Sequence, residues 1–167
     1  MTHMNALFQL GMDLAETHTS TTQTEGVSSH SVHEEETERK DFFVERDGKT
    51  FAGTHLIIDL VGAKWLDDVG YMERVMRRCV EACGATLLHI HLHHFTPNGG
   101  VSGVAVLAES HISVHTWPER DYAAFDVFMC GEAEPQRAVA ILKEAFAAEG
   151  CAVDELLRGE AAPEPRY

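Results

Sequence analysis

The sequence lacks the features by which several large classes of protein are recognised. It has 13 Lys and Arg against 27 Asp and Glu, a formal net charge of −14 with its 11 histidines neutral, and no cluster of basic side chains. Binding to a nucleic acid or to an anionic membrane needs such a cluster, so we expect neither as a partner. No apolar run approaches the about 20 residues of a membrane-spanning helix. The N-terminus lacks the basic start and small-residue cleavage site of a secretory signal, so we expect a cytoplasmic protein.

Cysteine is also scarce, and its spacing excludes two common kinds of site. The four cysteines, Cys79, Cys83, Cys130 and Cys151, form no CxxC pair, so neither a zinc ribbon nor a thioredoxin-like redox motif is indicated. Cys79 and Cys83 are four residues apart on a predicted helix and therefore face the same side. We interpret these two as buried thiols that serve as small apolar residues.

The composition changes near residue 50. Residues 15–45 are rich in Thr, Ser, Glu and His, and they carry eight acidic side chains against Arg39 and Lys40. Little apolar surface is then available to offset the conformational entropy of the chain, which favours disorder. We predict an acidic, disordered extension over residues 1–50, one folded domain over 51–160 and a flexible tail over 161–167.

Hydrophobic periodicity predicts an α+β domain. Period-two and apolar runs indicate strands, and amphipathic stretches indicate helices over 65–83 and 135–149. The strands are expected at 54–60, 85–95, 101–108, 111–117, 122–130 and 151–157. Short connections require antiparallel pairing, and both helices need a sheet to cover. We predict a two-layer sandwich of one antiparallel sheet with helices on one face; its other face would stay bare in a monomer, which favours a homodimer.

Histidines alternate with apolar residues in the strand predicted at 85–95. His89, His91 and His93 share one face there, opposite Leu88, Ile90 and Leu92. Alternating histidines can present two imidazoles to one zinc ion. No cysteine or carboxylate lies at a diagnostic spacing, so a non-catalytic, histidine-rich metal-binding module is a remote hypothesis, and we predict no metal site.

The segment 100–130 contains polar residues in what is otherwise strand sequence. His111, Ser113 and His115 would share a face of one strand, and a serine near a histidine suggests nucleophilic catalysis. There is no G-x-S-x-G nucleophile elbow, and no Asp in an obvious orienting position. The pattern therefore gives a hydrolase triad only weak support.

Three motifs carry a resemblance to a known family. The run AESHISVHTWPE at 108–119, with GVSG at 100–103 and FMCG at 128–131, closely resembles the prokaryotic S-adenosylmethionine decarboxylases. The resemblance covers about residues 54–157, including the order of strands and helices.

The resemblance implies that the chain is a proenzyme that cuts itself between Glu109 and Ser110. The Ser110 hydroxyl would attack the Glu109 carbonyl carbon, β-elimination of the resulting ester would leave a dehydroalanine, and hydrolysis would release ammonia and leave a pyruvoyl group. The family places His115 as the base for elimination and Ser102 as a second processing residue. Their residue types fit, because an imidazole titrates near neutrality and a hydroxyl can hydrogen-bond the ester.

The resemblance also implies the activity of the processed chain. The pyruvoyl group made from Ser110 would form a Schiff base with the substrate and serve as an electron sink for decarboxylation. Cys130 matches the family's proton donor, Glu119 the residue that binds the ribose hydroxyls, and Phe95 the aromatic side chain that stacks on adenine. The predicted function is decarboxylation of S-adenosylmethionine to supply aminopropyl groups for spermidine synthesis. The alternative is the same chemistry on ornithine or arginine, which Glu119 disfavours because a short amino acid has no ribose.

Overall fold

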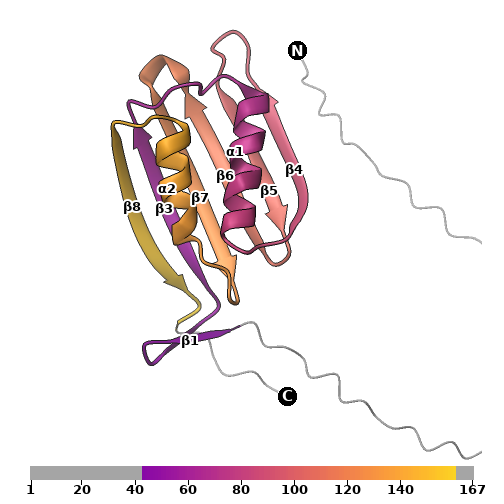
Figure 1. Ribbon diagram of the computed structural model, residues 1–167, viewed down its shortest axis with the longest axis vertical. Helices are drawn as coiled ribbons and strands as arrows, with labels where there is room; N and C mark the ends of the chain where they lie inside the picture. The colour runs from indigo at the N-terminus through magenta and orange to yellow at the C-terminus, as the bar shows by residue number, and fades with distance from the viewer. Residues whose placement is uncertain (1–42, 161–167) are drawn as a thin grey trace, which may run out of the picture. The chain divides into compact units, whose positions relative to one another are not determined.

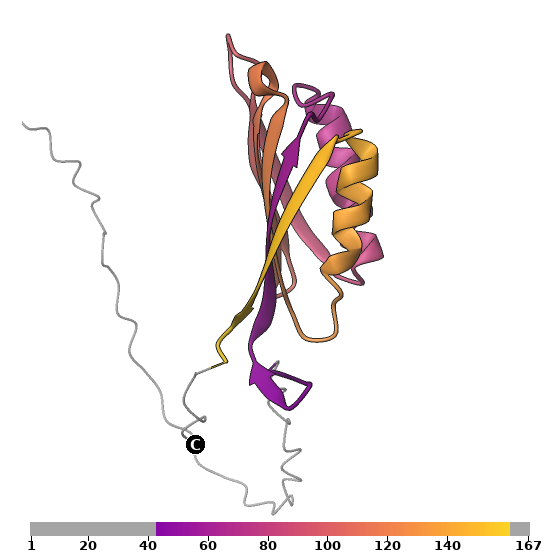
Figure 2. The ribbon, with the colours of Figure 1, turned by 90° about the vertical axis from the view of Figure 1, so that its left-hand side faces the viewer.

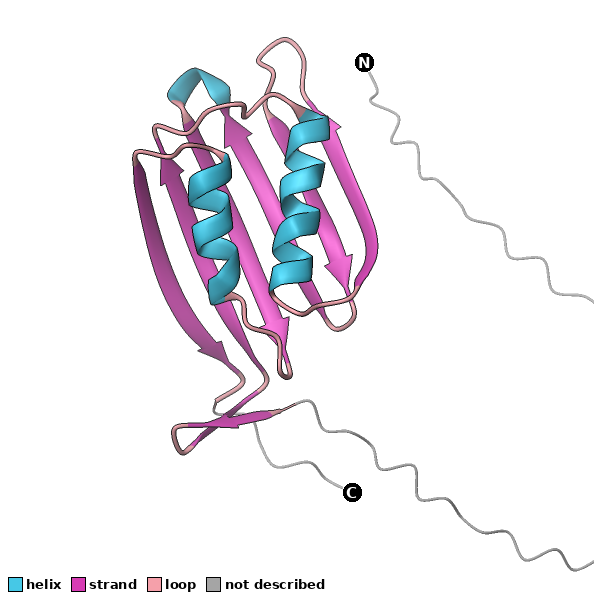
Figure 3. Cartoon of the chain, viewed as in Figure 1, coloured by secondary structure: helices cyan, strands magenta, loops and turns pink. Residues whose placement is uncertain are grey.

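The computed structural model describes residues 43–160, so the predictions for residues 1–42 and 161–167 fall outside the described part (Figure 1). Six strands form one antiparallel sheet in the order β4-β5-β6-β7-β3-β8. Two helices, α1 (Val69–Ala82) and α2 (Gln136–Ala145), pack on one face of this sheet (Figures 2 and 3). The strands are β3 (Gly53–Val61), β4 (Leu87–His94), β5 (Val101–Leu107), β6 (Ser110–Trp117), β7 (Tyr122–Cys130) and β8 (Gly150–Arg158). The predicted two-layer α+β sandwich is confirmed.

A hairpin precedes the sheet where the sequence predicted disorder. β1 (Val44–Arg46) pairs with β2 (Lys49–Phe51) around an Asp-Gly turn whose two residues both have positive φ. Asp-Gly is a preferred sequence for such two-residue turns, because glycine accepts the left-handed conformation without steric cost. Phe51 is only 1% exposed, so the hairpin ends in a buried anchor. Residues 44–50, which the sequence assigned to the extension, therefore contain regular secondary structure.

Both helices are shorter than the periodicity predicted. Helix α1 begins four residues later than expected, because the Asp68 side chain caps it by accepting a hydrogen bond from the Tyr71 amide at 2.8 Å. It ends at Ala82, and Gly84 follows with φ +74°, as predicted. Helix α2 ends at Ala145, before Ala147 with φ +45°. Neither error changes which apolar side chains reach the sheet.

The core lies between the sheet and the two helices. The buried face of α1 includes Met72, Met76, Cys79 and Val80, and Cys83 is buried just beyond its end. Burial raises the pKa of Cys79 to about 12, so this thiol is an apolar filler, as predicted.

The edge strand β4 contains an irregularity that the alternating pattern concealed. Its pairing with β5 shifts between Leu87 and His89, so Leu88 turns outward and is 64% exposed. Ile90 and Leu92 still pack against the core, and Leu87 takes the inward place predicted for Leu88. An extra residue of this kind is a β-bulge, which exposed edge strands often carry.

The other face of the sheet is not covered by any described element (Figure 2). Apolar side chains on it are well exposed, including Ile57 (38%), Val106 (41%) and Leu156 (46%). No helix among residues 43–160 is long and apolar enough to cross a membrane.

Candidate active site

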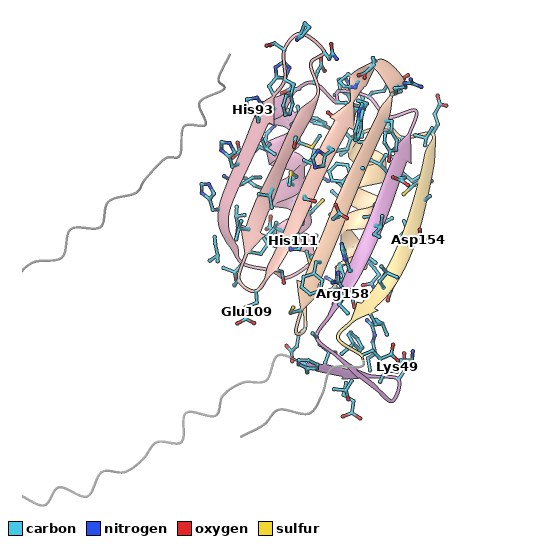
Figure 4. The ribbon with its side chains drawn as sticks, turned by 180° about the vertical axis from the view of Figure 1, so that it is seen from behind. Lys49, His93, Glu109, His111, Asp154 and Arg158 are labelled. Carbon is cyan, nitrogen blue, oxygen red and sulfur yellow. The ribbon has the colours of Figure 1, made fainter. Side chains whose placement is uncertain are left out.

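The predicted cleavage junction lies in the two-residue turn that joins β5 to β6. Leu107 pairs with Ser110, so Ala108 and Glu109 alone form the turn, at one end of the sheet (Figure 4). Glu109 has φ +63°. A residue with a Cβ pays roughly 1–2 kcal/mol for that left-handed conformation, which glycine adopts freely. The peptide bond between Glu109 and Ser110 therefore follows a strained, exposed residue.

Ser110 and Cys130 are neighbours at this end of the sheet. Ser110 begins β6 and Cys130 ends the adjacent β7, and the Cys130 amide N–H donates to Ser110 Oγ at 3.1 Å. Both residues are half-buried. Burial raises the pKa of the Cys130 thiol, and the Glu109 carboxylate raises it further, so the thiol stays protonated near neutral pH.

These residues line a cavity of about 1030 Å³. Besides Glu109, Ser110 and Cys130, its walls come from three segments: 84–86 after α1, 131–133 after β7, and 43–45 at the start of the hairpin. The cavity is large enough for a nucleoside-sized ligand and opens to solvent beside the predicted junction.

The other predicted site residues lie at the opposite end of the sheet. Ser102 on β5 and His115 on β6 are register partners, and both line a smaller cavity of about 350 Å³ together with Phe95 and Glu119. Phe95 is half exposed and packs edge-on against the His93 ring, with 4.6 Å between the ring centroids. Trp117 also lines this cavity, although the family resemblance assigned it no role.

The two groups of predicted residues are far apart within one chain. His115 is five residues beyond Ser110 on the same strand, and a strand rises about 3.3 Å per residue, which gives about 17 Å. An imidazole at that distance cannot take a proton from the Ser110 region. The fold therefore brings the predicted residues together as two half-sites, Ser110 with Cys130 and Ser102 with His115, Phe95 and Glu119.

Two glycines of the predicted motif allow the strands of the second half-site to meet. A Cβ on Gly103 would lie 2.2 Å from the His91 carbonyl oxygen, and one on Gly100 would lie 2.7 Å from that of Thr116. Only glycine fits where another backbone approaches so closely. The GVSG motif is thus required by strand packing around Ser102.

A polar cluster on the uncovered face contains partners of Ser113 and His111 that the sequence reasoning did not assign. Ser113 donates to Asp126 Oδ2 at 2.9 Å, the other Asp126 oxygen lies 3.5 Å from His55 Nε2, and Arg158 lies 3.1 Å from His55 Nδ1. Burial, and then the neighbouring His55, lower the pKa of His111. Because Ser113 bonds the carboxylate directly, the cluster is not a Ser-His-Asp triad. Only strand pairing places Asp126 beside Ser113, so no local motif could reveal it.

The alternating histidines belong to no cluster of three or more potential metal ligands among the described residues. His89, His91 and His93 all point outward and are exposed. No group of three or more His, Cys, Asp or Glu side chains within residues 43–160 could hold a metal ion.

Comparisons with known proteins agree on one family. The family model described as S-adenosylmethionine decarboxylase matches residues 54–159. An S-adenosylmethionine decarboxylase proenzyme of Thermomicrobium roseum is 43% identical over 108 residues, which are 64% of this chain and 93% of that relative. The proenzyme of Methanococcus maripaludis strain S2 is 46% identical over 110 residues, covering 64% of this chain and 89% of the relative.

A solved structure supports the same assignment. The crystal structure of the adenosylmethionine decarboxylase from Aquifex aeolicus VF5 superposes with a TM-score of 0.61 at 30% identity. The match covers 70% of this chain and 98% of that one. With the family model matching well over half of the sequence, the chain belongs to the S-adenosylmethionine decarboxylase family and is a decarboxylase.

Proposed function

We propose that this chain is a proenzyme that cuts itself between Glu109 and Ser110 and then decarboxylates S-adenosylmethionine with the pyruvoyl group so formed. The observation that carries the proposal is the hydrogen bond from the Cys130 amide to Ser110 Oγ, directly after the left-handed Glu109. The family assignment and the proenzyme names of the relatives support it.

The proposed first step is an attack of Ser110 on the carbonyl group of the preceding residue. Ser110 Oγ attacks the Glu109 carbonyl carbon, the peptide C–N bond breaks, and the nitrogen takes a proton, which leaves an ester and a free amine. A base then removes the Ser110 α-proton, and the bond from Cβ to Oγ breaks, which releases Glu109 as a carboxylate. The remaining dehydroalanine tautomerises and loses ammonia to water. Opening the turn also removes the strain at Glu109, roughly 1–2 kcal/mol that favours cleavage.

The residues around Ser110 fit the group that this reaction makes. Ser110 lies in the wall of an open cavity, where its Cα and Cβ would become the ketone carbon and methyl group of the pyruvoyl. That group supplies a carbonyl able to accept the electron pair left when carbon dioxide departs from an amino acid. Cys130 lines the same cavity, burial raises the pKa of its thiol so that it stays protonated, and this thiol can return a proton to the substrate carbon.

A homodimer would unite the two half-sites. A two-fold axis that lies between two such uncovered faces, perpendicular to the strands, would place the Ser110 end of one sheet over the His115 end of the partner's sheet. Each site would then combine Ser110 and Cys130 of one protomer with the partner subunit's His115, Ser102, Glu119 and Phe95. The exposed apolar side chains on that face favour such a contact. Ser110 and His115 are about 17 Å apart along β6, which supports a shared site over a site within one protomer.

The substrate assignment rests on the second half-site. Glu119, in the short 3-10 helix at 118–120, and Phe95 line the same small cavity, where a carboxylate can accept from ribose hydroxyls and a ring can stack on adenine. Decarboxylation leaves an aminopropyl group on the sulfonium, and we propose that spermidine synthesis consumes it. The four cysteines are unpaired, which suits the reducing cytoplasm.

Intact mass spectrometry of the purified protein tests the proposal. We expect chains of 109 and 58 residues, the smaller one blocked by pyruvate. Ser110→Ala is the matched control and should give one uncut, inactive chain. A wild-type chain that folds but stays whole, or a cut at another bond, would contradict it. The processed enzyme should release carbon dioxide from S-adenosylmethionine and not from ornithine or arginine.

A further inference from the structure

The hairpin that precedes the family region contributes to the cavity that holds the predicted cleavage junction. Phe43, Val44 and Glu45 line this cavity together with Ser110 and Cys130. The family model matches from residue 54 onward, so this wall lies outside the part of the chain that the family model covers. The other walls, after α1 and after β7, belong to the family region.

Several contacts fix the hairpin to the end of the sheet. The Arg46 guanidinium lies 3.2 Å from the Glu155 carboxylate on β8 and 5.2 Å from the centre of the Phe51 ring. Lys49 pairs with Glu160 at 2.8 Å, and the Ala52 amide donates to the Arg158 carbonyl at 2.7 Å. With Phe51 buried beneath Arg46, the hairpin is anchored on both strands (Figure 4 labels Lys49 and Arg158). The wall is therefore a fixed part of the cavity.

The hairpin also changes the charge of the cavity. Glu45 lies on its wall with Glu109 and Glu132, and none of the lining residues within 43–160 is Lys, Arg or His. The proposed substrate carries a sulfonium cation. A carboxylate on the cavity wall attracts this cation and repels anionic molecules that compete for the cavity. Glu45 is the acidic wall residue that the hairpin adds, and it is exposed to the cavity.

We propose that the β1–β2 hairpin is a functional wall of the Ser110–Cys130 cavity, in which Val44 limits access and Glu45 selects small molecules by charge, favouring cations over anions. The substrate part of this inference rests on the proposed function. The wall itself does not, because Cys130 can report on it without turnover.

Alkylation of Cys130 measures both properties of the wall. Neutral iodoacetamide and anionic iodoacetate are applied separately to the full-length protein, and modification of Cys130 is followed by peptide mass spectrometry, with the half-buried Cys151 as internal reference. The ratio of the iodoacetamide rate to the iodoacetate rate at one cysteine does not depend on the fraction of that thiol that is ionised. In Glu45→Gln this ratio at Cys130 should fall about twofold to fivefold at low salt, the usual range for exposed charge pairs. The change should shrink in roughly 1 M salt, where the screening length is about 3 Å.

Two variants of the same hairpin complete the design. Thr50 lies directly opposite Glu45 in the hairpin and does not line the cavity, so Thr50→Ala should leave the ratio unchanged. Val44→Ala trims the wall without altering charge; it should raise the iodoacetamide rate at Cys130 relative to Cys151 and keep the ratio between reagents constant. Circular dichroism confirms that each variant is folded.

The outcomes separate this inference from the proposed function. An unchanged ratio in folded Glu45→Gln, or an equal change in Thr50→Ala, overturns the charge-selecting wall. The alkylation is repeated in a Ser110→Ala background, so it decides the question even if the chain never cleaves. In the active enzyme, Glu45→Gln should raise the KM for S-adenosylmethionine about twofold to fivefold with kcat unchanged. A fall in kcat at constant KM would contradict the selecting role.

Discussion

Mixed dimers of two inactive variants test whether each active site is shared between protomers. Ser110→Ala removes the nucleophile of one half-site, and His115→Ala removes the imidazole of the other. The two side chains lie about 17 Å apart along β6, whereas proton transfer needs about 3 Å, so they cannot serve the same site within one chain. If sites form across a two-fold axis, a dimer of the two variants has one complete site and one site that lacks both groups.

The expected amounts follow from random association. When the variants are made in equal amounts, about half of the dimers are mixed, and each has one working site of two. About half of the His115→Ala chains should therefore be cleaved, the Ser110→Ala chains should stay whole, and turnover should reach about a quarter of wild type. Each variant alone should stay uncut.

Co-expression with two different affinity tags provides the assay. Tandem purification isolates the mixed dimers, a denaturing gel separates cleaved from whole chains, and mass spectrometry identifies which variant was cleaved. Hydroxylamine should cleave any ester at which the His115→Ala chain stalls. The matched control combines Ser110→Ala with Cys130→Ala. These two residues lie in the same half-site, so no site in that mixed dimer has both, and turnover should not recover.

Two results would refute the reasoning. Purified mixed dimers of the Ser110→Ala and His115→Ala chains that stay uncut would exclude a shared site. Normal cleavage of His115→Ala by itself would remove this imidazole from processing.

Four further outcomes are expected. Cys130→Ala should cleave normally but turn over about 100-fold or more slowly, since a positioned general acid contributes at least that factor, and normal turnover would remove Cys130 from the reaction. The pH profile of Cys130 alkylation should have its midpoint above the roughly 8.5 of an ordinary thiol, because burial raises its pKa; a midpoint at or below that value would contradict a protonated donor. Thr116→Val should lower the free energy of unfolding, measured in a urea titration, by about 2–4 kcal/mol. The buried Thr116 hydroxyl accepts a hydrogen bond from the Val101 amide at 2.7 Å and donates one to the Leu66 carbonyl at 2.8 Å, and valine can make neither. Gly103→Ala should be far less stable than Ala105→Gly in the same strand, because the added Cβ at residue 103 would collide with the His91 carbonyl oxygen on β4. Equal stability of the two variants would mean that β4 and β5 can move apart.

The sequence by itself determined the family and the order of the sheet strands along the chain, and it supplied the residues that we propose for the site. Alternation of apolar residues located all six strands of the sheet, because a period of two is imposed by the backbone and survives in any antiparallel context. The motifs around Ser110, His115 and Cys130 named the residues that we propose for cleavage and proton transfer. The helix boundaries were predicted less accurately. The Asp68 side chain sets the start of α1 by capping it, and the spacing of apolar residues contains no information about this cap.

Features that depend on contacts distant in sequence could be found only in the tertiary structure. The bulge that turns Leu88 outward arises from pairing with β5, and Asp126 reaches Ser113 because β7 lies beside β6.

Strand geometry also decided how the site residues are distributed. His115 and Ser110 are five residues apart in the sequence, which looks close, but an extended strand converts that spacing into about 17 Å. The fold therefore separates the predicted site into two halves at opposite ends of one sheet. The same folding places Glu45, from a segment expected to be disordered, on the wall of the Ser110 cavity. Local patterns specify which groups are present, whereas the pairing of strands decides which of them can meet.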